Sequence, residues 1–226
     1  MTLDAVVFDF DGLIIDSEWV IYESAAAAFA EHGHTLPVEA WATVVGTNER
    51  DERTQWEQLC AAVGAAGFTR EQYEAAYEAQ DRSNRDTLPA LPGVVELADA
   101  LVAAGVGLGI ASSSSLAWLQ RHVGRLAIDR HFPVLVGADV VGGVGKPSPD
   151  VYLRALADLG ADPARSVALE DSAHGVHAAK AAGMAVVAVP GPVTRSHDVS
   201  AADLVVDSLV DVTVAALEAL VTSAHR

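Results

Sequence analysis

Cysteine is almost absent from this sequence: Cys60 is the only one in 226 residues, so no disulfide can form within the chain. Cys60 falls in a helical pattern with no histidine near it in sequence, and we expect a packed or surface thiol, not a nucleophile. Apolar stretches long enough to cross a bilayer are also lacking, as is a basic segment before the first apolar run. We therefore expect no membrane partner and a cytoplasmic location.

Positive charge is scarce as well. The chain has 14 lysines and arginines against 31 acids, a net charge of −17, which argues against nucleic acid as a partner. Its only lysines are Lys146 and Lys180. Repulsion of an anionic substrate is screened beyond about 10 Å at ordinary salt. A site for such a substrate must therefore carry its own positive charge, from a metal ion or a lysine.

Short apolar runs rich in valine recur along a sequence that is 51% apolar. Continuous runs of this kind are typical of parallel strands buried on both faces. The runs are Ala5–Phe8, Val106–Ala111, Pro133–Val136, Val167–Leu169, Ala185–Val189 and Leu204–Val206. Helical patterns, each ending at a glycine suited to a left-handed cap, lie at Val94–Ala104, Asp150–Leu159 and Ala173–Ala182. This alternation predicts an α/β fold with a doubly wound, Rossmann-like parallel sheet.

One segment interrupts the alternation. Residues 17–87 contain helical patterns and no convincing strand, which predicts a small all-helical cap inserted after the first strand. The four patterns are Ser17–His32, Pro37–Val45, Glu49–Val63 and Arg70–Asp86. The catalytic core would then comprise residues 1–16 and 88–226, with connections near Ile15–Ser17 and Thr87–Pro92.

Polar side chains suited to chemistry lie beyond several of these runs. They are Asp9 with Asp11, the serines Ser112–Ser115, Lys146, and Glu170 with Asp171. Each group alone is also explained by a strand exit, a helix cap or solvated surface. In doubly wound sheets, however, ligands bind at the carboxyl ends of the strands, so all of these groups are predicted to converge.

The residue types suit phosphate chemistry. Asp9 and Asp11 are two apart on an extended chain and face the same side, so one carboxylate could attack while the other handles a proton. Serine hydroxyls and free N–H groups at a helix start bind phosphate well. The adjacent acids Glu170 and Asp171 suit Mg²⁺, which prefers oxygen ligands.

These motifs, in this order, resemble the haloacid dehalogenase-like hydrolase superfamily. The first signature is Asp9-Phe10-Asp11-Gly12, the second is Ser112, the third is Lys146, and the fourth is Glu170-Asp171. Within the superfamily the chain is similar to the phosphatase and β-phosphoglucomutase branch, whose helical cap follows the first strand. The resemblance covers essentially the whole chain and is loose only in the cap.

The resemblance implies a Mg²⁺-dependent phosphatase. Asp9 would be the nucleophile that forms an aspartyl-phosphate, and Asp11 would protonate the leaving oxygen and then activate water. By the same likeness Mg²⁺ would be held by Asp9, by Asp11 through its backbone carbonyl, and by Glu170 and Asp171. The transferring phosphoryl oxygens would be bound by Ser112, Ser113 and Lys146.

The cap is expected to choose the substrate, a small phosphorylated metabolite such as a sugar phosphate. The loop containing Gly46, Thr47 and Arg50 is the expected point of contact, and a monomer is the expected state. The main alternative is a β-phosphoglucomutase. Mutases of the family carry a cap histidine where Ile21 stands here, and an arginine near the position of Glu49, so a phosphatase is favoured.

A non-catalytic binding module is a further alternative. Such a protein would be expected to lose Asp9, Asp11 or Lys146, and all three are present. A dehalogenase would lack the second aspartate, and a phosphonate hydrolase of the family would need a cap lysine that this chain does not have.

Overall fold

A computed structural model describes residues 3–44, 52–65, 67–75 and 85–223. Its centre is one six-stranded sheet in the order β3-β2-β1-β4-β5-β6, and all of its pairings are parallel. The strands are β1 (Ala5–Phe8), β2 (Gly107–Ala111), β3 (Val134–Val136), β4 (Ser166–Glu170), β5 (Ala185–Ala188) and β6 (Leu204–Val205). The predicted doubly wound α/β fold is confirmed, and the strand order reverses direction at β1, between β2 and β4.

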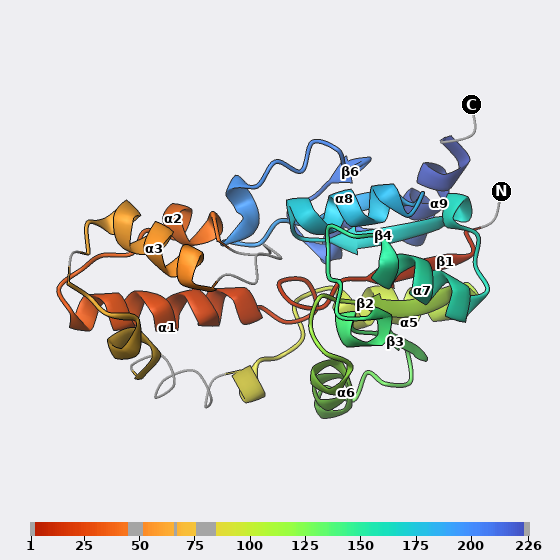
Figure 1. The fold of residues 1–226 in the computed structure, drawn as a ribbon. Coiled ribbons are helices and arrows are strands. Elements are labelled where there is room, and N and C mark those ends of the chain that lie inside the picture. The colour runs from red at the N-terminus through yellow and green to blue at the C-terminus, as the bar shows by residue number, and fades with distance from the viewer. Residues whose placement is uncertain (1–2, 45–51, 66, 76–84, 224–226) are drawn as a thin grey trace.

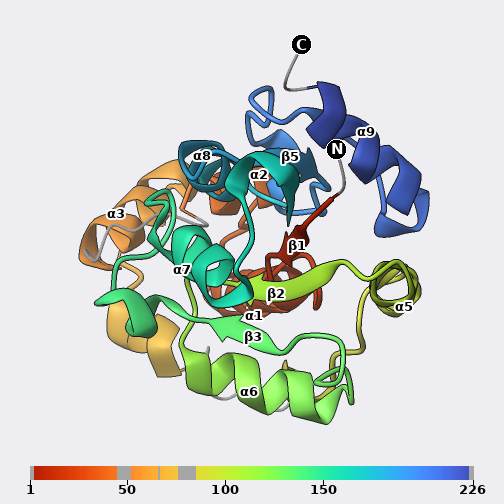
Figure 2. The ribbon, with the colours of Figure 1, turned by 90° about the vertical axis from the view of Figure 1, so that its right-hand side faces the viewer.

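Helices cover both faces of the sheet (Figures 1 and 2). They are α5 (Val94–Ala103), α6 (Leu116–Arg125), α7 (Asp150–Leu159), α8 (Ala173–Ala181) and α9 (Val214–Ser223). Side chains alternate along β1, so Val6 and Phe8 enter the apolar cluster under α5, α6 and α9, while Val7 enters the one under α7 and α8. Both faces of β1 are therefore buried, as its unbroken apolar run indicates.

The regular elements in the described part of the segment after β1 are all helices. The segment contains α1 (Ser17–Glu31), α2 (Val38–Ala42), α3 (Glu52–Val63) and a helical stretch over residues 70–75. These helices have an apolar cluster of their own around Phe29, whose ring lies 5.0 Å from that of Phe68 and 5.6 Å from that of Trp56. Figure 1 shows them beyond the end of the sheet at which β1 finishes, so we refer to them as the cap.

The predicted helix Arg70–Asp86 needs correction. Residues 70–75 are helical, but Arg85–Thr87 form a separate short 3₁₀ helix, η1, and residues 76–84 lie outside the described chain. The restriction that Pro89 places on Leu88 explains why no regular helix continues into the core. Helix α9 had no counterpart among the predicted elements.

The cap joins the core through two segments that lie side by side. Asp16 caps α1, since its carboxylate accepts a hydrogen bond from the Trp19 N–H at 3.2 Å. The returning segment donates the Leu91 N–H to the Ile14 carbonyl at 2.8 Å. A further contact runs from the core loop to α2, where His197 Nε2 lies 3.0 Å from the Ala42 carbonyl oxygen. The cap therefore contacts the core at both of its connections and also at α2.

The remaining elements are short 3₁₀ helices on the core surface. They are η2 (Ala138–Val141), η3 (Pro163–Arg165), η4 (Thr194–Ser196) and η5 (Leu209–Asp211). Among the residues that the structure describes, no helix has both the length and the apolar character needed to span a bilayer.

Candidate active site

The first two candidate acids leave the end of β1. The Asp9 N–H donates to the Leu169 carbonyl at 2.9 Å, so the neighbouring strand β4 fixes the backbone from which its carboxylate projects. Gly12 then turns the chain at a φ of +87°, where a Cβ would lie 2.3 Å from Asp171 Oδ2. Only glycine allows this turn to pass so close to the fourth motif.

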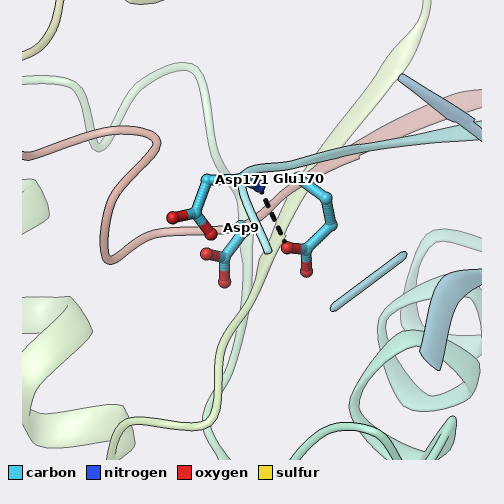
Figure 3. A group of neighbouring side chains, drawn as sticks. All are labelled: Asp9, Glu170 and Asp171. Atoms are coloured by element: carbon cyan, nitrogen blue, oxygen red, sulfur yellow. Dashed lines mark hydrogen bonds between the residues drawn. The ribbon is translucent and has the colours of Figure 1, made fainter. Parts of the chain in front are cut away.

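The acids of the first and fourth motifs meet in space. Asp9, Glu170 and Asp171 each offer a carboxylate oxygen within 4.8 Å of the others, and all three are buried (Figure 3). No other group of this kind occurs in the described part of the chain. Buried carboxylate oxygens gathered around one point suit a hard cation such as Mg²⁺, which prefers oxygen donors.

Lys146 brings positive charge into this cluster. Its buried ammonium group contacts the carboxylates of both Asp9 and Glu170. It also lies 5.0 Å from the ring centroid of Tyr152, whose hydroxyl donates to Glu170 Oε1 at 2.5 Å. Although burial opposes its charge, attraction by Asp9 and Glu170 outweighs this, so the pKa of Lys146 is raised and it stays protonated.

Glu170 is placed differently from the other two acids. Its Oε1 atom accepts from Lys146 and Tyr152, and its Oε2 accepts from the Asp171 N–H at 3.2 Å. It does not line the cavity described below. The structure therefore shows Glu170 as the residue that holds Lys146, while its direct bond to a metal stays a prediction.

The cluster carries more negative charge than Lys146 can balance. Burial and then the charge of Glu170 raise the pKa of Asp9 from 3.8 to about 8. Burial and then the charge of Asp9 raise the pKa of Asp171 well above its ordinary value. A divalent cation would supply the missing positive charge and favour the ionised carboxylates, so these residues fit the expected Mg²⁺.

The serine run packs against Asp11 and the lysine loop. Ser114 donates its hydroxyl to Asp11 Oδ2 at 2.6 Å, and Ser112 does so at 3.4 Å. The Ser113 hydroxyl accepts the backbone N–H of Lys146 at 3.0 Å. All the predicted phosphate-binding residues thus come together beside both aspartates.

One cavity of about 210 Å³ joins these groups. The predicted residues that line it are Asp9, Asp11, Ser112, Ser113, Lys146 and Asp171. It also has lining residues that we did not predict, namely Glu18, Arg85, Ser114, Trp118, His174 and Thr194. The candidate cap contacts Gly46, Thr47 and Arg50 lie outside the described residues.

The missed residues gave little sequence signal. Glu18 lies on the first turn of α1, and burial followed by the charge of Asp11 raises its pKa to about 7. Thr194, the first residue of η4, donates to Asp171 Oδ2 at 3.2 Å. Among them, Ser114 belongs to the serine run, and His174 lies shortly after the Glu170-Asp171 motif in the sequence. The others are single residues that the folding of helices and loops brings to the cavity.

Comparisons with known proteins identify the family to which this chain is similar. A family model described as haloacid dehalogenase-like hydrolase matches residues 6–189. YhcW of Bacillus subtilis strain 168, provisionally described as a phosphatase, is 37% identical over 197 residues, or 85% of this chain and 86% of that protein. Hexitol phosphatase B of Escherichia coli K12 is 31% identical over 227 residues, or 92% of this chain and 94% of that protein. A solved structure, a HAD family hydrolase of Deinococcus radiodurans R1 with bound phosphate and sodium, matches with a TM-score of 0.79 at 28% identity, covering 99% of this chain and 96% of that chain.

The buried acids predict how pH and Mg²⁺ affect stability. The pKa of Asp9 is raised from 3.8 to about 8, and that of Asp171 is raised too. At pH values between 3.8 and about 8, the folded protein therefore binds more protons than the unfolded chain. The metal-free protein should therefore lose stability as pH rises toward about 8. Calorimetry should show Mg²⁺ raising Tm more at about pH 8 than at about pH 6, because the metal binds ionised carboxylates.

The matched control for this measurement is Asp171→Asn, which removes one ionisable donor and should reduce the difference between the two pH values. EDTA should return the wild-type protein to its metal-free Tm. An effect of Mg²⁺ that is equal at both pH values would contradict the assignment of the cation to these acids.

Gly175 predicts a second, steric test. It lies in the first turn of α8, and a Cβ there would come within 2.0 Å of the Glu170 carboxylate. Gly175→Ala should therefore destabilise the protein by about 1–3 kcal/mol and displace Glu170 from Lys146, lowering activity. Gly124, in α6, has nothing within 4 Å of its Cβ position, so Gly124→Ala is the control and should be neutral or slightly stabilising. Equal Tm values for the two variants in thermal melts would refute the prediction.

Proposed function

The chain belongs to the haloacid dehalogenase-like hydrolases, and we propose that it is a Mg²⁺-dependent phosphatase that attacks small phosphate monoesters with the carboxylate of Asp9. The observation that carries the proposal is the position of Lys146, the one lysine in the cavity. Its ammonium group contacts the Asp9 carboxylate, with Asp11 and Asp171 lining the same cavity. Attack of one anion on another needs compensating positive charge at this point.

In the first half-reaction, an Asp9 carboxylate oxygen forms a bond to phosphorus as the bond to the leaving oxygen breaks. Asp11 gives its proton to that oxygen, so an alcohol departs and an aspartyl-phosphate remains. Lys146 and the hydroxyls of Ser112 and Ser113 bind the phosphoryl oxygens, whose charge they offset. Mg²⁺, held by Asp9, Asp171 and the Asp11 carbonyl, would supply further positive charge at the phosphoryl group.

In the second half-reaction, Asp11 is ionised and takes a proton from water. The water oxygen bonds to phosphorus as the bond to Asp9 breaks, which releases phosphate and regenerates the carboxylate. The cap helices that close one side of the cavity reduce the access of bulk water to the first step, since Glu18 and Ile21 of α1 line it.

Sugar phosphates or closely related metabolites are the proposed substrates. The relatives that support this class include a hexitol phosphatase similar to the chain over 92% of its length. A cavity of about 210 Å³ suits a small phosphate ester. The monomeric state and the cytoplasmic location stay predictions of the sequence.

A mutase reaction is less well supported by the site. Ile21, which stands where the family mutases carry a histidine, lines the cavity and offers no group for proton transfer. The loop with Glu49 lies outside the described residues. A purely binding role is also disfavoured, because buried ion clusters cost stability and strongly perturbed pKa values like those of Asp9 and Asp171 concentrate at catalytic sites.

The central prediction concerns Asp9. Asp9→Asn should lower turnover of sugar and hexitol phosphates at least about 1,000-fold while leaving the fold intact, because the amide cannot attack phosphorus. Phosphate release from a metabolite panel, with Mg²⁺ and with EDTA, measures it. The control is Asp158→Asn, a surface acid that pairs with Arg154 and should retain full activity.

Two outcomes would count against the proposal. Substantial phosphate release by Asp9→Asn would remove Asp9 as the nucleophile. Wild-type activity that persists unchanged in EDTA would remove the metal from the reaction.

A further inference from the structure

A stripe of side chains on α6 faces the segment that returns from the cap to the core. The residues are Trp118, Arg121, His122 and Arg125, which recur at the spacing of one helix face. Arg121 forms an ion pair with Asp86, and the Arg125 guanidinium donates to the Leu88 carbonyl at 2.6 Å. The returning segment is thus attached to the core helix at successive residues, close to the cavity.

Trp118 connects this attachment to the cavity. The guanidinium carbon of Arg85, the first residue of η1, lies 5.6 Å from the Trp118 ring centroid, within the range of a cation–π contact. Within α6, the ring centroid of His122 lies 3.9 Å from that of Trp118. Both Arg85 and Trp118 line the cavity. Contacts with the linker and with its own helix therefore restrict the rotation of the indole.

The indole edge reaches the proposed acid. Trp118 Nε1–H donates to Asp11 Oδ1 at 3.1 Å, and Ser17, the first residue of α1, donates to the same oxygen at 2.8 Å. The other oxygen, Oδ2, accepts from the hydroxyl of Ser114 at 2.6 Å and from that of Ser112 at 3.4 Å. The two sides of the carboxyl group are therefore different in kind. An indole N–H can only donate, whereas a serine hydroxyl can also turn and accept.

We propose that Trp118 is a positioning residue for the proton transfer by Asp11. The indole N–H can only donate, so it keeps Oδ1 as an acceptor, and the transferable proton is assigned to Oδ2, beside Ser114. The inference rests on the proposed function. During phosphoryl transfer the proton on Oδ2 passes to the leaving oxygen as the bond from that oxygen to phosphorus breaks and the bond from Asp9 to phosphorus forms.

The contacts on α6 give this orientation a structural origin. Arg85 touches the Trp118 ring from the returning segment, while Ser17 contacts Asp11 from the entering segment. Both connections of the cap thus act on the Asp11 carboxyl group. The entering segment contacts it directly through Ser17, and the returning segment contacts it through the Trp118 indole. The placement of the acid therefore depends on the placement of both connections.

Trp118→Phe tests the inference, since it keeps an aromatic ring and removes only the donor side of the indole. Two substrates separate proton transfer from other effects. A hexitol phosphate has a poor alcohol leaving group that needs the proton, whereas p-nitrophenyl phosphate has a leaving group that departs without one. The first turnover of each should be followed by rapid mixing, so that later hydrolysis of the aspartyl-phosphate does not limit the signal.

The variant should release the hexitol about tenfold more slowly than wild type, with p-nitrophenolate release changed by less than about twofold and KM for both substrates nearly constant. The control is Trp41→Phe in the cap, because the buried indole Nε1 of Trp41 has no hydrogen-bond partner among the described residues. That variant should slow neither substrate. Thermal melts of both variants check that each is folded, and half-buried Trp118 should tolerate the smaller ring.

Equal slowing of the two substrates, or no slowing of either, would overturn the inference and leave the proposed function standing. Wild-type protein that releases neither product would overturn the proposed function, and the role of Trp118 with it.

Discussion

The contact between the Lys146 ammonium and the Asp9 carboxylate is the interaction on which the site depends. Three buried carboxylates lie around one point, and burial, followed by their mutual repulsion, raises the pKa values of Asp9 and Asp171. Lys146 offsets part of it, and Glu170 with Tyr152 holds the lysine in place. A site that remains short of positive charge is suited to a divalent cation and an anionic substrate bound together.

The sheet explains how such an unfavourable cluster is held. Asp9 follows β1, the serine run follows β2 and Glu170 is the last residue of β4, so the register of these adjacent strands fixes their backbones. The apolar layers on both faces supply the stability that the buried charges do not. Chemistry at the carboxyl ends of the strands is thereby separated from the residues that hold the fold together.

The cap stands in a different relation to the reaction. Its helices pack around Phe29 as a cluster distinct from those of the sheet, yet its connections reach the cavity through Ser17, Glu18 and Arg85. A domain attached in this way can vary its own surface to suit different leaving groups while the chemistry of the core stays the same. Its connections are also where Asp11 gains partners that the core alone does not provide.

The sequence by itself determined the parallel α/β core, because buried strands are continuous apolar runs. It also pointed to Asp9, Asp11, Lys146 and Asp171, because each of these residues directly follows its strand or lies in the loop beyond it. Strand ends were predictable to within a residue or so, whereas the last cap helix was not. Only the tertiary structure decided which side chains complete the site. Residues such as Trp118 and Glu18 lie on helices, where the spacing of side chains is explained equally well by ordinary packing. Only the folding of the whole chain brings these single residues to one cavity.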